Sequence, residues 1–487
     1  MTHSQTAVFR RLVRDHMADA PVVVPLGSTA AETVALMAQN RASAAVVVDG
    51  DGAIRGILTE QDVVRRIACR RIGHQPVDGL MTRPVFTVRA DDPLYRAIGF
   101  MRRKRLRHMP VVDDGGRLVG MLFLHDALGS AVGPLLEEID RLTHEDTMEG
   151  LAQVKAAEVE LARRLLADEV PAPEIQALVS DLNNDLYRRV LRLVTAELES
   201  DGWGAAPVPF AAIVMGSGGR RESFLFPDQD NGFVLADYPD EAHAAIDPWF
   251  IECAERMTRA LDRLGFRLCK GGVMATNPLW RKSISQWKAQ VAGWMRKKHE
   301  AMLLFCDIFF DFLPVWGERR LAEDLRAFVT ETAPKNPLFL REMFGIQADH
   351  RAGIGLFNRF ITERQDPEHK GHINLKLMGT LPLAEAVRLW ALRHGVAETG
   401  TLARIQALHA MDKLSEDEAD RLRAAFVFIT GLQLRQQIAD YDAGRPVGNF
   451  VDPKSLTDRE RETLKDAFRA INDFRARLRS ELTGRLL

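Results

Sequence analysis

The sequence predicts a multidomain α/β protein in which helical segments connect and follow the α/β domains. Three observations lead to this prediction: a pattern that occurs twice within residues 1–133, a glycine-rich turn between two apolar runs in residues 210–236, and apolar residues at helical spacing on both sides of that turn. A chain of 487 residues accommodates roughly three or four domains of ordinary size.

Composition narrows the class of protein. Hydrophobic residues make up 46% of the chain and charged residues 27%, as in ordinary soluble domains. The net charge of −2 gives no overall reason to expect binding to nucleic acid or to membranes. The four cysteines form no CxxC pair, which argues against a zinc site or a disulfide framework and favours a cytoplasmic location. The sequence contains neither a run of about 18 apolar residues nor an apolar signal core, so we expect no membrane contact.

The first domain is predicted to be a tandem repeat over residues 1–133. When the sequence is shifted by 64 positions, Met17 aligns with Met81 and Gly56 aligns with Gly120, and no gap is needed. A repeat of fixed period indicates two copies of one supersecondary unit, here with a helix, two strands and a closing helix in each copy. The copies span residues 17–71 and 81–133, with predicted helices at 30–40 and 92–104 and predicted strands at 44–48 and 108–112.

Two segments of this repeat resemble a pair of CBS domains, an α+β family. They read Gly56-Ile57-Leu58-Thr59-Glu60-Gln61-Asp62 and Gly120-Met121-Leu122-Phe123-Leu124-His125-Asp126. The resemblance implies that Thr59, Asp62 and Asp126 bind an adenine nucleotide (AMP, ADP or ATP) and that the pair can form a homodimer. Phe123 replaces the threonine in the second copy, so two unequal sites are expected. The alternative is that Asp62 and Asp126 cap the closing helices.

Residues 134–199 are predicted to form a helical linker. Apolar residues recur at helical spacing in two segments, and Pro171 and Pro173 separate them. Three roles are open for this linker: transmission of a state of the repeat to the next domain, passive spacing, or dimerisation.

A candidate nucleotide site follows the linker. Residues 216–230 read Gly-Ser-Gly-Gly-Arg-Arg-Glu-Ser-Phe-Leu-Phe-Pro-Asp-Gln-Asp, between predicted strands at 210–215 and 233–236. Residues two apart in an extended chain point to the same side, so Asp228 and Asp230 should aim two carboxylates at one point. Such oxygen ligands suit Mg²⁺ or Mn²⁺. The glycines allow backbone N–H groups to approach phosphate oxygens, so the segment predicts a site for a nucleoside triphosphate and its metal.

The same segment resembles the nucleotidyltransferase superfamily that includes DNA polymerase beta. The matching pattern is Gly-Ser-x-x-Arg-x-Glu-x5-Asp-x-Asp, formed by Gly216, Ser217, Arg220, Glu222, Asp228 and Asp230. The resemblance is closer to the PII-protein uridylyltransferases and closest to the bacterial CBS-domain proteins with a DUF294 nucleotidyltransferase domain. It implies a polymerase-beta-like α/β domain over residues 200–335. It also implies phosphate binding by Gly216, Ser217, Gly218, Gly219 and Arg220, with Glu222 orienting Arg220 or the loop.

This resemblance also implies a third metal-binding carboxylate on a later strand. A predicted strand over residues 303–315 offers Asp307 and Asp311, which lie four residues apart on one face. The segment 309–317 matches the DUF294 group better around Asp311. We therefore expect Asp311 to complete the catalytic set with Asp228 and Asp230.

Residues 336–487 are predicted to be a helical C-terminal domain. Ser415-x-x-Glu418 and Thr457-x-x-Glu460 are capping-box patterns, which mark the starts of helices. The region resembles the substrate-binding domain that accompanies these transferases.

Two further patterns each allow two interpretations. Trp280, Trp287 and Trp294 recur every seven residues, a spacing more typical of a core than of a stacking platform for bases. Lys376 either reaches a phosphate or packs between helices.

The predicted function is the metal-dependent transfer of a nucleoside monophosphate from a triphosphate to an acceptor, regulated by adenine nucleotide at the repeat, as part of signal transduction. Protein, tRNA and small molecule all remain open as the acceptor. The alternative function is that of a catalytically inactive nucleotide-sensing regulator or scaffold.

Overall fold

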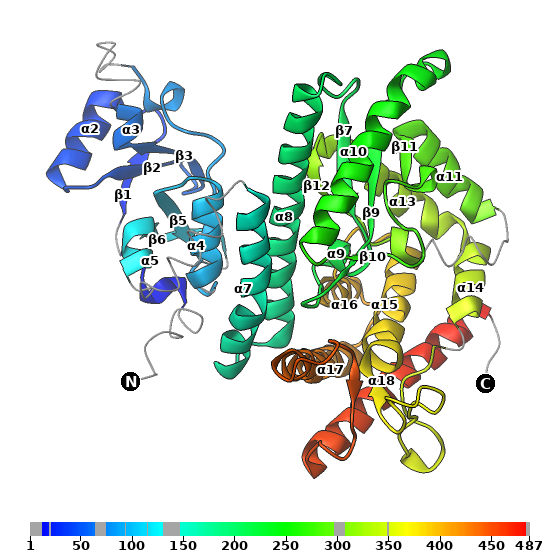
Figure 1. The fold of residues 1–487 in the computed structure, drawn as a ribbon. Coiled ribbons are helices and arrows are strands. Elements are labelled where there is room, and N and C mark those ends of the chain that lie inside the picture. The colour runs from blue at the N-terminus through cyan, green and yellow to red at the C-terminus, as the bar shows by residue number, and fades with distance from the viewer. Residues whose placement is uncertain are drawn as a thin grey trace. The chain divides into compact units, whose positions relative to one another are not determined.

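The chain forms two compact units, Met1–Thr143 and His144–Leu487. The computed structural model describes residues 12–18, 21–63, 75–92, 94–113, 115–129, 147–296, 307–347 and 350–483. Figure 1 shows the whole chain, and each unit is described by itself. None of the helices in these described ranges combines the length and the apolar character that a membrane crossing requires.

The first unit contains two three-stranded sheets of the same design. The first sheet has the order β1 (Val22–Pro25), β2 (Ala44–Val48), β3 (Ile54–Thr59), and the second has the order β4 (Val88–Arg89), β5 (His108–Val112), β6 (Leu118–Phe123). In each sheet the first pair of strands is parallel and the second pair is antiparallel. The helices are α2 (Ala30–Gln39), α3 (Glu60–Asp62), α4 (Leu94–Arg103) and α5 (Leu124–Gly129). The predicted tandem α+β repeat is therefore confirmed.

The two copies exchange short segments of chain. Ala18 bridges to Met121 in the second copy, and Thr82 bridges to Ile57 in the first. Each sheet is thus extended by a residue that lies outside its own strands, and the two copies form one structural unit.

Glycine at two repeated positions makes room for this exchange. A Cβ atom on Gly56 would lie 1.9 Å from Sδ of Met81, and one on Gly120 would lie 2.6 Å from Sδ of Met17. A larger residue would push the methionine away, so the repeated glycines and methionines of the sequence are explained by one packing contact made twice.

The second unit is built around a four-stranded sheet with the order β11 (Arg281–Ser283), β9 (Asn231–Leu235), β7 (Phe210–Val214), β12 (Leu313–Gly317). Strand β7 is antiparallel to both β9 and β12, and β11 is parallel to β9. A separate parallel pair joins β8 (Asp228–Gln229) to β10 (Arg267–Leu268). The two apolar runs predicted as strands around the glycine turn are therefore β7 and β9.

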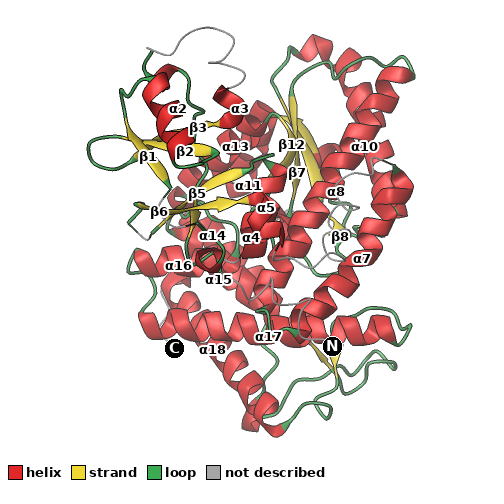
Figure 2. Ribbon diagram, turned by 90° about the vertical axis from the view of Figure 1, so that its left-hand side faces the viewer, coloured by secondary structure: helices red, strands yellow, loops and turns green. Residues whose placement is uncertain are grey.

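Helices cover both faces of the sheet (Figures 1 and 2). On one face, α10 (His243–Arg263) packs Phe250 against Phe210 and Phe233, with ring centroids 5.2 and 6.4 Å apart. On the other face, α11 (Ile284–Arg296) and α13 (Arg319–Thr332) share a core with Ile213 and Val234. Alternating residues of each strand thus serve opposite faces, as the pleat requires.

The three regularly spaced tryptophans belong to this core. Trp280 and Trp287 are fully buried, and Trp294 is 3% exposed. Trp287 stacks on Phe309 with 4.9 Å between ring centroids. The prediction that the stripe is structural is confirmed.

The predicted linker forms two helices that belong to the second unit. They are α7 (Met148–Ala167) and α8 (Ala172–Ser200), and Pro171 is the N-cap of α8, as the proline break predicts. Helix α8 contacts β12, α10 and α17 (Glu416–Asp442). The passive-spacer interpretation is therefore wrong for α8, which is a wall of the domain.

The strand predicted over residues 303–315 is confirmed for residues 313–315, which belong to β12, and is wrong for residues 307–312; residues 303–306 lie outside the described ranges. Residues 307–309 form a helical turn, and the strand begins only at Leu313. Phe309, Phe310 and Phe312 are all buried. Asp311 between them is buried as well, and the turn brings these consecutive side chains into the interior of the domain.

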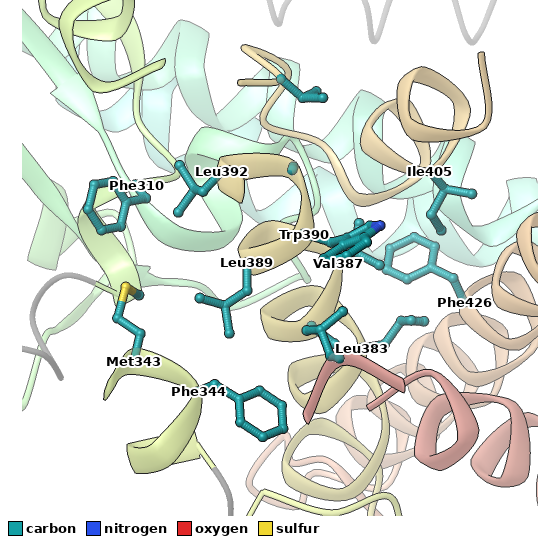
Figure 3. Packing of buried hydrophobic residues seen from close by; sticks show 14 of the residues in the cluster. Phe310, Met343, Phe344, Leu383, Val387, Leu389, Trp390, Leu392, Ile405 and Phe426 are labelled. Atoms are coloured by element: carbon teal, nitrogen blue, oxygen red, sulfur yellow. The ribbon is translucent and has the colours of Figure 1, made fainter. Parts of the chain in front are cut away.

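The C-terminal region is helical, as predicted. Its main helices are α14 (Pro337–Ile346), α15 (Leu381–Arg393), α16 (Thr401–Ala410), α17 and α18 (Asp458–Thr483). Both predicted capping boxes form: Ser415 caps α17 with Glu418, and Thr457 bonds to Glu460 at the start of α18. Helix α15 is buried on nearly every face, and Figure 3 shows its Leu389 and Leu392 beside residues of other elements. A single hydrophobic cluster joins the sheet and these helices.

Candidate nucleotide site

Two carboxylates project into one cavity of the second unit. Between Asp228 and Asp230, Gln229 is fully buried, and its Nε2 donates to the carbonyl oxygen of Phe266 at 3.0 Å. The neighbouring aspartates therefore face the other way, and both line the cavity. The expected same-side arrangement of the two acids is present.

The rest of the cavity wall comes from α8, the segment 217–230, β10 and the C-terminal helices. Its cationic side chains are Arg220, Arg267 and Lys376, its aromatic side chains are Phe224, Phe226 and Phe426, and its amides are Gln176, Gln437 and Asn449. Cations and acids suit a metal–triphosphate, whereas aromatic and amide groups suit an organic ring.

Asp230 is held against the glycine turn. Gly216 has a φ of 58°, and a Cβ atom on it would lie 3.0 Å from Oδ2 of Asp230. Glycine is therefore required here both by the backbone conformation and by the close approach of the carboxylate. Burial raises the pKa of Asp230 to about 6, against the lowering effect of a hydrogen bond from Cys269.

The acid pair fits a divalent cation. Oδ1 of Asp230 is buried and accepts no hydrogen bond from any residue that the structure describes. A buried carboxylate oxygen without a partner is costly, and a cation would satisfy it. Within the described ranges, no group of three or more His, Cys, Asp or Glu residues is placed to hold a metal. Mg²⁺ commonly takes one or two carboxylates and completes its shell with water and substrate phosphates, which suits this pair.

The raised pKa of Asp230 predicts a pH dependence for cation binding. Because protons compete with the cation for this carboxylate, Mn²⁺ affinity should fall about tenfold per pH unit once the pH is below about 6. Calorimetric titration of Mn²⁺ at several pH values between 5 and 8 measures this slope. The single variant Asp230→Asn should lose the slope together with most of the affinity, whereas a slope that persists in this variant would point to another group.

The glycine turn differs from the expected phosphate cradle. Residues Gly216–Arg220 form the short helix α9, and the amide N–H of Gly219 donates to the carbonyl oxygen of Met215 at 3.2 Å. A Cβ atom on Gly219 would lie 1.7 Å from the backbone oxygen of Asp311. Gly219 therefore serves a close packing contact and not a phosphate. Of the small residues in the turn, Ser217 lines the cavity.

Arg220 and Glu222 form a pair at the edge of the cavity. Nε of Arg220 donates to Oε2 of Glu222 at 2.7 Å. Glu222 also accepts from the hydroxyl of Thr401 at 3.1 Å and from its backbone amide. The carboxylate thus orients Arg220, as expected, and ties the turn to the start of α16.

Asp311 does not share the cavity with the acid pair. It is fully buried, and it receives hydrogen bonds or ion pairs from Arg220 at 2.8 Å, Arg388 at 2.6 Å and Arg404 at 2.6 Å. Burial opposes its ionisation, but the guanidinium groups, Arg404 foremost, hold the pKa of Asp311 well below its ordinary value. The expectation that Asp311 binds metal is corrected, because the arginines already occupy this carboxylate.

Asp307 does not provide the expected third metal ligand in place of Asp311. Its side chain is 20% exposed, pairs with Arg388 and accepts from Nε2 of Gln347. Neither acid of the segment 307–311 lines the cavity. The two arginines from α15 and α16 that decide this arrangement lie far along the chain, and no local pattern marks them.

Other cavity residues were missed or left open by the sequence. Lys376 is exposed and lines the cavity, which argues against the interpretation that it packs between helices. Arg267, Gln176 and Asn449 were not singled out, because no motif surrounds them. Arg267 reaches Asp228 through the pairing of β10 with β8, which only the folded structure shows.

In the first copy of the repeat, Thr59 and Asp62 form a capping box at the start of α3. The hydroxyl of Thr59 donates to Oδ2 of Asp62 at 2.8 Å, and Thr82 donates to Oδ1 of the same residue at 3.2 Å. The capping interpretation is thus confirmed for Asp62. Asp126 is exposed on α5, and Phe123 precedes that helix where Thr59 stands in the first copy. Nucleotide binding at both positions stays a prediction.

Fold and site together define a protein that joins a tandem α+β repeat to an α/β domain whose acid-lined cavity is closed by helices. Residues 13–69 and 77–133 match the CBS domain, residues 157–301 match the family described as "Putative nucleotidyltransferase DUF294", and residues 337–482 match the "Putative nucleotidyltransferase substrate binding domain". The chain is therefore a CBS-pair protein of the DUF294 family. The DUF294 match begins within α7, in keeping with the place of α7 and α8 in the second unit.

Similar proteins of known sequence or structure cover only part of the chain. Inosine-5'-monophosphate dehydrogenase of Mycobacterium bovis is 32% identical over 115 residues, which are 24% of this chain and 21% of that enzyme. The CBS domain-containing protein CBSX3 of Arabidopsis thaliana is 33% identical over 120 residues, 23% of this chain and 58% of that protein. The crystal structure of a CBS-domain protein from Agrobacterium tumefaciens is 27% identical, with a TM-score of 0.23, over 25% of this chain and 93% of that one. A CBS domain protein from Pyrobaculum aerophilum complexed with AMP is 30% identical, with a TM-score of 0.23, over 24% of this chain and 89% of that one.

Proposed function

We propose that this protein is a metal-dependent nucleotidyltransferase that moves a nucleoside monophosphate from a triphosphate to an acceptor, with release of pyrophosphate. The observation that carries the proposal is the cavity that Asp228 and Asp230 line together with Arg267 and Lys376. Membership of the DUF294 family supports the same reaction type.

The residues of the cavity have separable tasks in this reaction. Asp228 and Asp230 would hold Mg²⁺ or Mn²⁺, which supplies charge neutralisation and polarisation of phosphate oxygens when bound. Lys376 and Arg267 bind the negative phosphate oxygens through charge-assisted hydrogen bonds. Ser217 adds a hydroxyl at the same wall. Arg220 borders the site, with two of its nitrogens already committed to Glu222 and Asp311.

The test of this function is incorporation of label. The protein is incubated with each α-labelled nucleoside triphosphate, Mg²⁺ or Mn²⁺, and host lysate, and the lysate is then fractionated into protein, RNA and small molecules. Metal-dependent label in one fraction, absent from the Asp228→Asn/Asp230→Asn variant, is the expected result, and we expect protein to be that fraction. No incorporation from any of the triphosphates would contradict the proposal.

One observation favours a second candidate, a nucleotide-sensing regulator that no longer turns over. Among the described residues, three acids line the cavity: Glu222, Asp228 and Asp230. Glu222 is already engaged by Arg220 and Thr401, so only the two aspartates remain to bind a metal. A protein of this kind would bind a triphosphate with metal but transfer no label. Calorimetry together with the labelling assay separates the two candidates.

Regulation by adenine nucleotide at the repeat is proposed as part of the same function, with the tighter site at Thr59 and Asp62. In the full-length protein without divalent metal, Asp62→Ala should weaken AMP binding about tenfold or more, because a ribose hydroxyl loses a charged acceptor. Asp126→Ala is the matched control and should change AMP affinity little. Calorimetry measures both variants, and two equal sites, or none, would contradict this prediction.

A further inference from the structure

Gln176 on α8 lines the cavity and carries a buried acceptor that has no hydrogen-bond partner among the described residues. Its side chain lines the cavity although the residue is only 2% exposed. Nε2 donates to the backbone oxygen of Glu222 at 3.0 Å. Because only the nitrogen of an amide can donate, this contact fixes the orientation of the group. Oε1 is buried and receives no hydrogen bond from any residue in the described part of the chain.

Asn449 presents the opposite polarity. Its Oδ1 accepts hydrogen bonds from Nε2 of Gln433 at 2.5 Å and from Nε2 of Gln437 at 3.2 Å. Oε1 of Gln437 in turn accepts from the backbone amide of Leu225 at 3.3 Å, which leaves Nε2 of Gln437 to donate to Asn449. The carbonyl oxygen of Asn449 is thereby engaged, and its amino group remains as a donor on a residue that lines the cavity.

Aromatic side chains lie in the same cavity. Phe224, Phe226 and Phe426 contribute to its lining, and Phe226 is itself stacked on Tyr441 with 6.1 Å between ring centroids. Aromatic faces bind the flat face of a nucleobase, whereas directed amides read its edge. A phosphate chain offers neither a flat face nor an N–H donor.

We propose that Gln176 and Asn449 form a nucleobase subsite in which Oε1 of Gln176 accepts from a base N–H and the Asn449 amino group donates to a base acceptor. Each of the four common bases carries a donor and an acceptor on one edge, but their positions along that edge differ from base to base, so this pair can distinguish one base from another. The subsite rests on the proposed nucleotidyltransferase function and deepens it: phosphates bind at the acidic and basic groups, and the base binds at the amide groups.

The test compares ligands with and without a base. Calorimetry on the full chain with Mn²⁺ measures binding of the four nucleoside triphosphates and of inorganic tripolyphosphate. Gln176→Met, which keeps the shape of the side chain, should weaken binding of the preferred triphosphate about five- to tenfold. It should also reduce the differences in affinity among the four triphosphates. Binding of tripolyphosphate should stay unchanged.

Ser180 offers a matched control. It lies one helical turn from Gln176 on α8, is fully buried, and accepts from the backbone amide of Ser223 at 2.9 Å. It thus holds the same loop from the same helix without lining the cavity. If Gln176 only holds this loop, Ser180→Ala should reproduce the effect of Gln176→Met, and that result would overturn the subsite.

A second variant keeps the proposal open to test if Gln176→Met does not fold. Asn449→Asp retains the acceptor for Gln433 and Gln437 but exchanges the cavity-facing donor for an acceptor, so the order of preference among the four triphosphates should change. Equal weakening of all triphosphates and of tripolyphosphate, or an unchanged order of preference, would overturn the subsite. If the wild type binds triphosphates selectively but transfers no label, the subsite stands and only the transferase function fails. If it binds no triphosphate, both fail.

Discussion

Replacing both Asp228 and Asp230 by asparagine should reduce metal-dependent transfer at least about a thousandfold while leaving the fold intact. The reaction depends on charge neutralisation by a cation, and loss of that stabilisation, roughly 4 kcal/mol or more, corresponds to this factor. Asparagine has nearly the size of aspartate, so the double substitution removes both negative charges from the cavity without changing its shape.

The stability of this variant is part of the prediction. Burial, together with a smaller contribution from the nearby charge of Asp228, raises the pKa of Asp230 to about 6. Because the folded-state pKa lies above the unfolded value, ionisation of this group costs stability as the pH rises through about 6, and that cost is present at pH 7. The double variant should therefore unfold at the same temperature as the wild type or at a higher one.

Thermal unfolding and the labelling assay measure the two halves of this prediction. Asp237→Asn is a suitable control, since Asp237 lies just beyond the far end of β9 and accepts from the hydroxyl of Ser285 at 2.6 Å, outside the cavity. That variant should retain transfer. Full activity in the double variant would show that the two acids do not hold the reacting metal.

Replacing Asp311 by alanine should destabilise the protein by about 3–5 kcal/mol. The change removes the shared counter-charge of Arg220, Arg388 and Arg404, of which the last two are 1% exposed. A buried charge that loses its partner is among the most costly defects in a folded protein. The loss should exceed that of a surface ion pair, which is typically below about 1 kcal/mol.

Urea denaturation at pH 7 measures this loss. Asp307→Ala is the matched control, because Asp307 is 20% exposed and pairs with one arginine of the same cluster, and its loss should be clearly smaller. The depressed pKa of Asp311 means that its contribution is present above the unfolded pKa of about 3.9 and is lost only as the pH falls far below it. An Asp311→Ala variant with wild-type stability but without Mn²⁺ binding would restore the metal-ligand assignment.

Local patterns determined much of this protein. The 64-residue period gave the two matching sheets of the first unit, and the alternation at Asp228, Gln229 and Asp230 placed both acids on one side of the chain. The capping boxes at Ser415 and Thr457 marked the starts of α17 and α18. These features depend on contacts between residues a few positions apart, and the sequence displays such spacings directly.

Tertiary packing decided the remainder. The sequence predicted Asp311 as a third metal ligand, but in the structure a helical turn and arginines from α15 and α16 enclose it. One of these, Arg388, lies 77 residues further along the chain. The amides of the cavity are likewise assembled over long separations: Gln176 reaches Glu222 across 46 residues, and Gln437 reaches Leu225 across 212. Periodicity specifies which face of an element is buried, but not which distant element covers it. That choice depends on the shape of the whole core, so the role of a buried charged group followed only from the folded structure.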